Sequence, residues 1–138
     1  MARGGRIGSV VMFVTELNRS VSFYTDVLTL RVADSSPTAA LLVSDDGSWL
    51  ILRAMGSNAG HALGSVGVQY VTWNAADKEE LDQSELALKQ RSAHRDTRSH
   101  GTAVAVEGRD PDDITVMIVY PGPGEGEDAK LPLRIYGW

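Results

Sequence analysis

The sequence predicts an α+β protein made of two successive modules, each with the element order β-α-β-β-β. Two segments have the apolar spacing of a helix, and each follows one strand-like segment and precedes three others. The two halves therefore repeat one pattern with a period of about 60 residues. Of the 138 residues, 43% are hydrophobic, which is enough for one domain with a buried core.

The first module is predicted over residues 6–54. Residues 6–14 (RIGSVVMFV) are apolar and β-branched, which is typical of a buried strand. Residues 16–28 repeat their apolar side chains at helical spacing. Ser/Pro and Asp-Gly breaks then separate three short strand candidates, which read LRVADSS, TAALLVSD and GSWLILRA.

The second module is predicted over residues 66–121, after a small, Gly-rich segment at 55–66. It begins with the strand-like run VGVQYVTWN. Asp77 is a good N-cap for the helix that follows, and Glu80 stands three residues on, as in a capping box. Three strand candidates complete the module, namely HRDTRSH, TAVAVEG and DITVMIVY.

Residues 122–138 are predicted to form a C-terminal extension. Residues 121–131 contain two prolines and three glycines and are incompatible with regular structure. Tyr136 and Trp138 then restore aromatic character near the end. We expect this extension to pack on the body of the protein or on a second subunit.

Composition excludes several classes of function. The formal net charge is −5, with 13 Lys and Arg against 18 Asp and Glu, which argues against binding to a nucleic-acid backbone. The chain has no cysteine, so it forms neither disulfides nor thiolate metal sites. No apolar run is long enough for a membrane span. We therefore expect a soluble, cytoplasmic protein with no membrane partner.

Two stretches carry a family resemblance. Residues 13–32 (FVTELNRSVSFYTDVLTLRV) combine an acidic residue and leucine with a helix that contains Phe-Tyr, and residues 108–121 (GRDPDDITVMIVYP) place Arg-Asp-Pro-Asp before a strand. The chain, to about residue 121, resembles the vicinal oxygen chelate superfamily, which includes glyoxalase I, extradiol dioxygenases and bleomycin-resistance proteins. Thr29 and Asp113 depart from the family pattern, because each stands at a turn position where glycine is usual.

The resemblance implies an incomplete barrel of strands around a cavity, with the helices outside, in a homodimer. Family enzymes hold a divalent metal with His and Glu side chains from the first and last strand of each module. Alignment to the motifs places Ser9, Ile51, Tyr70 and Met117 at those positions, and none of them is a usual ligand of such a metal. A shift of one residue gives no ligand either. We therefore expect no metal or other cofactor; convergence of His61, His94 and His100 on a metal is the alternative.

Strand alternation then predicts which side chains face the cavity. Trp49 and Arg53 share one face of their strand, whereas Leu50 and Leu52 face the helix, and Trp73 also has helix-side parity. Aromatic rings, a thioether and a guanidinium suit an organic ligand. The candidate ligand-binding residues are Phe13, Trp49, Ile51, Arg53, His61, Tyr70, Thr72 and Met117. Core packing is the alternative role for Trp49 and Met117, and solvent exposure is the alternative for Arg53 and His61.

The function expected from these features is sequestration of a bulky aromatic antibiotic, of bleomycin, mitomycin, enediyne or quinone type, by a metal-free homodimer. In that case the protein is a binding protein without catalytic residues, as the bleomycin-resistance branch implies. The alternative is a lyase, isomerase or dioxygenase of the same fold, either cofactor-independent or metal-dependent. Such an enzyme without a cofactor needs an acid or base in the cavity.

Overall fold

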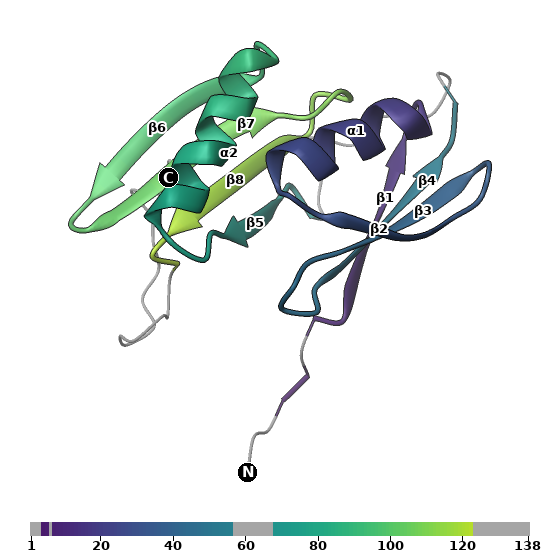
Figure 1. Ribbon diagram of the computed structural model, residues 1–138, viewed down its shortest axis with the longest axis horizontal. Coiled ribbons are helices and arrows are strands. Elements are labelled where there is room, and N and C mark those ends of the chain that lie inside the picture. The colour runs from purple at the N-terminus through teal and green to yellow at the C-terminus, as the bar shows by residue number, and fades with distance from the viewer. Residues whose placement is uncertain (1–3, 6, 57–67, 123–138) are drawn as a thin grey trace. The chain divides into compact units, whose positions relative to one another are not determined.

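The computed structural model of the chain describes residues 4, 5, 7–56 and 68–122. It divides into two compact units, Met1–His61 and Ala62–Trp138, called here module 1 and module 2. Each contains one helix and one four-stranded sheet (Figure 1), so the α+β fold of two β-α-β-β-β modules is confirmed. No helix in the described part of the chain is both long and apolar enough to cross a bilayer.

Module 1 forms a mixed sheet with the strand order β1-β4-β3-β2. The pair β1–β4 is parallel, and the other two pairs are antiparallel. The elements are β1 (Ser9–Val14), α1 (Leu17–Val27), β2 (Arg31–Ser35), β3 (Ala39–Val43) and β4 (Trp49–Ala54).

Module 2 repeats this topology with the strand order β5-β8-β7-β6, and β5–β8 is again the parallel pair. Of the strand predicted over 66–74, residues 71–74 pair regularly and residues 68–70 lie outside the strand, whereas 66 and 67 are not among the described residues. The elements are β5 (Val71–Asn74), α2 (Lys78–Gln90), β6 (His94–His100), β7 (Ala103–Arg109) and β8 (Thr115–Tyr120).

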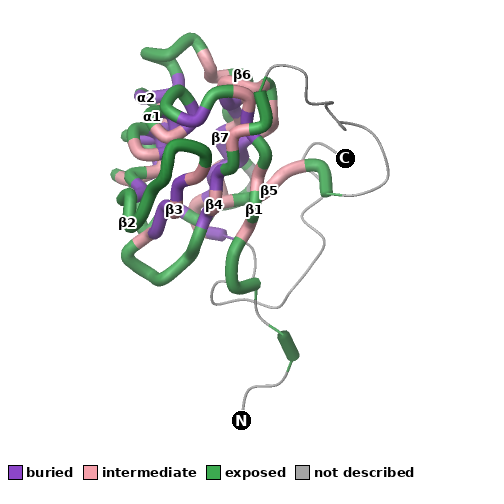
Figure 2. The backbone as a smooth tube through the Cα atoms, turned by 90° about the vertical axis from the view of Figure 1, so that its right-hand side faces the viewer, coloured by how far each residue is buried: buried purple, intermediate pink, exposed green. Residues whose placement is uncertain are grey.

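One face of each sheet is covered by the helix of its own module. In module 1, Leu42, Leu50 and Leu52 are buried on that face, and α1 contributes Phe23 and Tyr24, whose rings meet edge to face with centroids 5.0 Å apart. Burial therefore alternates along β4, whereas the edge strand β2 is exposed along its whole length (Figure 2). Among the described residues of each module, the helix packs on one face of the sheet alone, and we call the second face the open face.

The two modules share a bulge in the edge strand. Pairing shifts by one residue between Val32 and Asp34 in β2, and between His94 and Asp96 in β6. In each case the aspartate accepts a hydrogen bond from the next backbone N–H, at 2.9 Å. The same bulge, with the same aspartate hydrogen bond, thus occurs in both modules, which supports the internal duplication that the sequence pattern predicts.

The ends of the helices also correspond. Asp77 caps α2 by accepting a hydrogen bond from Glu80 N at 2.8 Å, as predicted. At the other end, Ala93 N donates to Leu88 O at 2.8 Å, and Ser92 is left-handed with φ 56°. Thr29 takes the same place after α1, with φ 51°. Both positions need a residue that tolerates positive φ, which explains why glycine is usual in the family at the position of Thr29.

Thr29→Gly is expected to stabilise the protein by about 1 kcal/mol, because a β-branched residue pays a steric cost at positive φ that glycine avoids. Urea unfolding followed by circular dichroism measures the change. Ser22→Gly, within α1 and exposed, is the matched control and should instead lower the free energy of unfolding by about 0.5 kcal/mol. An equal decrease in the free energy of unfolding of the two variants would contradict the assignment of strain to Thr29.

Two hairpin loops of the same length join the last strand pairs, at residues 44–48 and 110–114. Ser44 and Asp110 open them, and the backbone N–H of each donates a hydrogen bond to the backbone carbonyl of the residue four places on. The fourth residue is left-handed in both, Gly47 with φ 92° and Asp113 with φ 64°. The buried Asp110 carboxylate also accepts from the N–H groups of residues 112 and 114, at 2.8 and 2.9 Å. The Arg-Asp-Pro-Asp motif is therefore a structural turn.

In the first of these loops, hydrogen bonds from the hydroxyl of Ser44 and from Ser48 lower the pKa of Asp46 below 3.8. Because the pKa of Asp46 is lower in the folded state than in the unfolded state, its ionised carboxylate stabilises the fold above about pH 4. This stabilisation is lost as the pH falls through the folded-state pKa. Asp46→Asn should therefore be less stable than wild type at pH 7, with a smaller difference at pH 2.5. The difference in free energy of unfolding between Ser44→Ala and wild type should likewise be smaller at pH 2.5 than at pH 7. A difference that is the same at both pH values would contradict this account.

Candidate functional site

The open face of module 1 is apolar and aromatic. Strand register places Ser9 beside Trp49, Val11 beside Ile51, and Phe13 beside Arg53. Three of its large hydrophobic side chains are exposed, namely Val11 (57%), Phe13 (55%) and Trp49 (49%). The predicted alternation is confirmed here, because Leu50 and Leu52 are buried on the helix side. Four predicted ligand-binding residues thus share one surface: Phe13, Trp49, Ile51 and Arg53.

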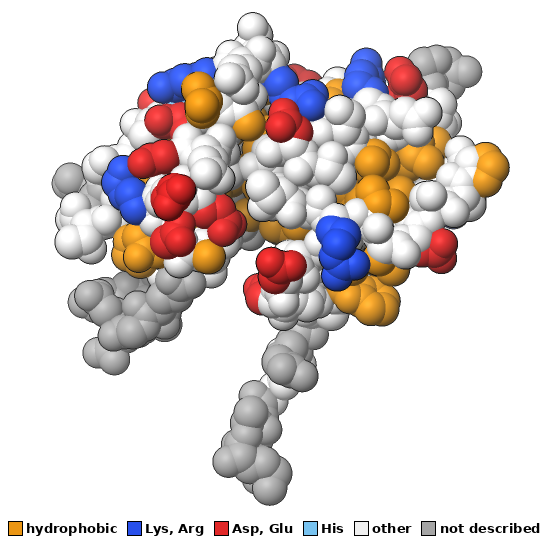
Figure 3. Space-filling view, viewed as in Figure 1, with side chains coloured by type: hydrophobic (Ala, Val, Ile, Leu, Met, Phe, Trp, Pro, Cys, Tyr) orange, Lys and Arg blue, Asp and Glu red, His pale blue; other side chains and the backbone are white. Residues whose placement is uncertain are grey.

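The two modules differ in the chemistry of their surfaces. Figure 3 shows hydrophobic side chains gathered over the strands of module 1 and charged side chains over α2. Helix α2 carries Glu79 and Glu80 in its first turn, and Lys78 pairs with Asp82 at 3.1 Å. Such exposed pairs are common on solvated helices and contribute little to stability. The charges of α2 therefore need no functional explanation.

On the open face of module 2, Met117 pairs with Thr72 across the parallel strands. Met117 is only 1% exposed and forms a buried cluster with Ala105 and Val119, against which Tyr70 packs. The structure thus brings together three predicted site residues, Tyr70, Thr72 and Met117, although the thioether of Met117 is fully buried. His61 lies outside the described residues, as do Tyr136 and Trp138.

A charged cluster beside Met117 escaped the sequence reasoning. Glu107 on β7 is the register partner of Met117. Its Oε1 accepts a hydrogen bond from Arg98 Nη1 at 3.0 Å, and its Oε2 lies 3.7 Å from Arg109 Nη2. Arg98 also donates to Asp96 at 2.9 Å. We call Asp96, Arg98, Glu107 and Arg109 the charged quartet.

Three members of the quartet are partly buried, whereas the side chain of Asp96 is exposed. The side chains of Arg98, Glu107 and Arg109 are 23%, 19% and 29% exposed. Burial by itself lowers the pKa of Arg98, but hydrogen bonds to Asp96 and Glu107 outweigh it and raise that pKa. The same hydrogen bond from Arg98 lowers the pKa of Asp96. The hydrogen bond between Arg98 and Asp96 therefore favours the charged forms of both side chains.

A sequence signal for this cluster was present. The five-residue loop 110–114 fixes the hairpin register, so Glu107 must face Met117 and Arg109 must face Thr115. Counting outward from the turn motif would have found both residues. Arg98 was harder to place, because the bulge between His94 and Asp96 shifts the register of β6 by one residue.

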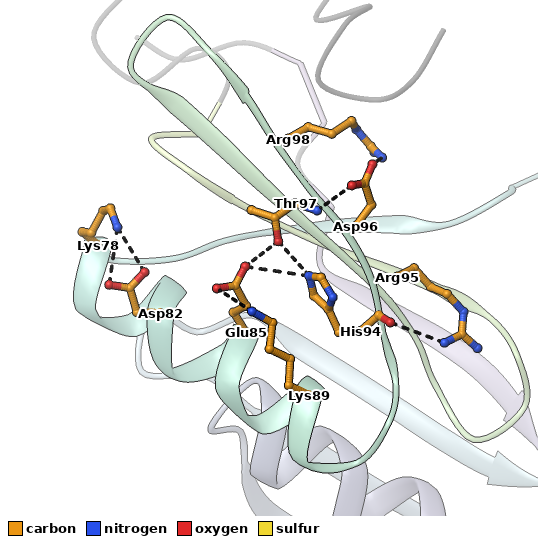
Figure 4. A network of polar contacts seen from close by, with 9 residues as sticks. All are labelled: Lys78, Asp82, Glu85, Lys89, His94, Arg95, Asp96, Thr97 and Arg98. Atoms are coloured by element: carbon orange, nitrogen blue, oxygen red, sulfur yellow. Dashed lines mark hydrogen bonds and ion pairs between the residues drawn. The ribbon is translucent and has the colours of Figure 1, made fainter.

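A second polar network joins α2 to β6 on the other side of the sheet (Figure 4). Thr97 Oγ1 hydrogen-bonds both Glu85 and His94, with 2.7 Å to His94 Nε2, and His94 Nε2 lies 3.8 Å from Glu85 Oε2. A carboxylate only accepts, so Thr97 donates to Glu85 and accepts from His94. The network therefore connects helix α2 to strand β6 through side-chain hydrogen bonds.

Convergence of the histidines on a metal is not seen. His94 and His100 are the first and last residues of β6, which separates their backbones by about 20 Å. His61 falls outside the described residues. Within residues 4–5, 7–56 and 68–122, no group of three or more His, Cys, Asp or Glu side chains is arranged to hold a metal ion.

Strand register shows which residues of the two modules are equivalent at the positions that the family resemblance assigns to metal ligands. Leu50 and Val116 are equivalent, since each lies two residues beyond an equivalent hairpin loop, and their parallel partners are Val10 and Val71. Each preceding residue, Ser9 and Tyr70, is therefore also equivalent, as predicted. The set Ser9, Ile51, Tyr70 and Met117 offers two hydroxyls, a hydrocarbon and a buried thioether. These donors do not fit a divalent metal that prefers imidazole and carboxylate.

Comparison with known proteins identifies the family. The model of the glyoxalase/bleomycin resistance protein/dioxygenase superfamily matches residues 6–118. The chain belongs to this superfamily. No match was found among curated proteins.

Several solved structures share the fold at low sequence identity. A glyoxylase/bleomycin resistance protein/dioxygenase domain from Frankia sp. EAN1pec has a TM-score of 0.71 and 20% identity, covering 85% of this chain and 98% of that one. Lactoylglutathione lyase from Agrobacterium tumefaciens has a TM-score of 0.63 and 20% identity, covering 86% and 95%. The fosfomycin resistance protein FosX from Mesorhizobium loti has a TM-score of 0.67 and 13% identity, covering 91% and 98%. These identities support a shared fold alone.

Proposed function

We propose that this superfamily member is a metal-free protein that binds a bulky aromatic small molecule and protects the cell by sequestering it. The observation that carries the proposal is the strand register, which makes Ser9 equivalent to Tyr70 and Ile51 equivalent to Met117. The family resemblance assigns its metal ligands to these four positions. Without imidazole or carboxylate at those positions, the protein lacks the usual means of activating an oxygen substrate through a metal.

The open face of module 1 supports an aromatic ligand. Phe13 and Trp49 present flat surfaces that are half exposed, and Ile51 lies beside Val11 between them. Aromatic pairs contribute about 0.5–1.5 kcal/mol beyond the burial of apolar area. Arg53, next to Phe13, adds a guanidinium that stacks on a ring or donates to a carboxylate or quinone oxygen.

Sequestration on this scheme is stoichiometric. The drug is held away from its target, and no bond in it forms or breaks. A homodimer, as is common in soluble proteins, would provide two equivalent sites. Candidate ligands are compounds of bleomycin, mitomycin, enediyne or quinone type, because each carries a flat or partly aromatic body.

An enzymatic function is the second candidate, and Glu107 is the observation that favours it. This carboxylate lies beside Met117 on the open face of module 2, where an acid or base would be needed. Proteins of the same fold include a lactoylglutathione lyase and a fosfomycin resistance protein. Against this role, Arg98 and Arg109 already engage both carboxylate oxygens of Glu107.

A panel titration distinguishes the two functions. The purified protein is titrated with bleomycin, mitomycin C and a simple naphthoquinone while tryptophan fluorescence is recorded, and the compound is then recovered and analysed by mass spectrometry. Saturable binding with an unaltered compound supports sequestration, whereas turnover supports the enzyme. One tightly held zinc, iron or manganese ion per chain by elemental analysis would overturn the proposal.

A further inference from the structure

Three apolar side chains on the open face of module 2 are fully buried, namely Ala105 (0% exposed), Met117 (1%) and Val119 (0%). We call these three residues the apolar patch. Tyr70 packs against the patch, and Arg98 Nη2 lies 3.7 Å from Met117 Sδ. Because α2 packs on the other face of the sheet, the Arg98 side chain provides part of the cover on this face.

Arg98 reaches the patch from the edge of the sheet. It lies on β6, whereas Met117 lies two strands away on β8, and neighbouring strands are about 4.8 Å apart. Register pairs Arg98 with Ala105 on β7, the strand between them. The side chains of Arg98 and Met117 therefore meet above β7, where Ala105 contributes only a methyl group.

Two carboxylates hold Arg98 in this position. Arg98 Nη1 donates a hydrogen bond to Asp96 Oδ2 at 2.9 Å and to Glu107 Oε1 at 3.0 Å. The pair with Asp96 is visible in Figure 4. Hydrogen bonds between two charged groups are stronger than those between neutral groups. The placement of the guanidinium over the patch therefore depends on its two ion pairs.

Module 1 shows the same face of the sheet without such a side chain. Ser36 is the counterpart of Arg98, because each lies two residues beyond the aspartate of the bulge. Ile51 is the counterpart of Met117, and it is half-buried, whereas Met117 is 1% exposed. A serine side chain is too short to extend over the neighbouring strand. The difference in burial between the two modules thus follows the presence of the arginine.

We propose that Arg98 is a cover held by ion pairs, which keeps the apolar patch closed to small molecules and opens it when the guanidinium leaves Asp96 and Glu107. The inference rests on the proposed function and concerns the regulation of its site. The apolar surface of module 1 is open to a ligand, whereas Met117 becomes accessible only after Arg98 moves. A change of rotamer in this one side chain is enough, so the strands stay paired.

Oxidation of methionine measures whether the patch is open. Hydrogen peroxide transfers one oxygen atom to an accessible thioether and leaves water, and peptide mass spectrometry of the oxidised full chain reports the sulfoxide at each methionine separately. Met55, which is 42% exposed in module 1, is the internal reference. Arg98→Ala is expected to speed oxidation of Met117 about tenfold, the equivalent of one charge-assisted hydrogen bond, and to leave the rate at Met55 unchanged.

Two further variants separate the cover from a change in charge. Asp96→Asn with Glu107→Gln weakens the hold on Arg98 without removing its side chain, so it should speed oxidation of Met117 about threefold. Arg95→Ala removes an exposed arginine from the same strand and should leave the rate at Met117 unchanged. An equal effect of Arg95→Ala and Arg98→Ala would overturn the proposal.

Hydrogen exchange of the α2 amides shows whether module 2 stays folded in these variants. Faster oxidation of Met117 with unchanged protection of α2 supports the cover. Equal oxidation rates in wild type and Arg98→Ala would overturn it. Faster oxidation together with loss of α2 protection would also overturn it, because Arg98 would then support the fold of the module. These measurements need no ligand, so a failure of the proposed binding function is seen separately, in the panel titration.

Discussion

Replacing Phe13 and Trp49 together with alanine is expected to weaken binding of the aromatic ligand about 100-fold, equivalent to about 2.7 kcal/mol. Both rings lie on the open face of module 1, each about half exposed, so their removal takes away stacking area without emptying the core. Affinity is measured by equilibrium dialysis with the compound that the panel identifies, because loss of Trp49 also removes a fluorescent reporter.

Leu86→Ala is the matched control for this prediction. Leu86 is 56% exposed on α2 and belongs to neither open face, so its truncation removes apolar surface from a region without a binding role. We expect its affinity to equal that of wild type. A double variant of Phe13 and Trp49 that binds within about threefold of wild type would show that the ligand contacts another surface.

Gly108→Val is expected to destabilise the protein by about 3 kcal/mol or more. A Cβ at this position would lie 2.7 Å from Leu88 Cδ2 and 2.9 Å from the backbone oxygen of Ala93. The oxygen is fixed by a hydrogen bond from Arg109 N at 2.9 Å, so the end of α2 and strand β7 are unable to separate without losing it. Overpacking of this kind in a buried site costs about 1–3 kcal/mol, and the backbone contact adds to it.

Urea unfolding of Gly108→Val and of Ser99→Val measures the difference. Ser99 is exposed on β6, so the same side chain there should change the free energy of unfolding by less than about 0.5 kcal/mol. Similar values for the two variants would mean that α2 adjusts to the added side chain. In that case the close approach at Gly108 would not be a constraint on module 2.

Local signals carried most of the fold prediction. The periodicity of 16–28 predicted α1 within one residue at each end, and Asp77 marked the start of α2. Breaks at Ser-Pro and Asp-Gly separated the strands of module 1 correctly. These features depend on neighbouring residues alone, so no knowledge of tertiary contacts was needed. The first and fifth strands were predicted to begin too early, because residues 7–8 and 68–70 have strand-like composition but lie outside the regular pairing of β1 and β5.

The turn departures were also readable from sequence, but their physical meaning was not. Thr29 and Asp113 stood out against the family pattern, and the structure shows that both have positive φ. Gly47, with φ 92°, takes the position in the hairpin loop of module 1 that Asp113 takes in module 2. An aspartate tolerates this region better than threonine does, so the two substitutions are not equivalent in cost.

One part of the candidate site was predictable from the sequence, and another part depended on the pairing of the strands. Strand parity alone placed Phe13, Trp49, Ile51 and Arg53 on one face, because alternation is a property of the single strand. The charged quartet depends on how three strands pair, and a one-residue bulge decides whether Asp96 and Arg98 reach Glu107. The sequence by itself determined the two modules, their helices and the apolar surface of module 1. Only the tertiary structure decided the surroundings of Glu107 and Arg109, since cross-strand neighbours are set by register between strands.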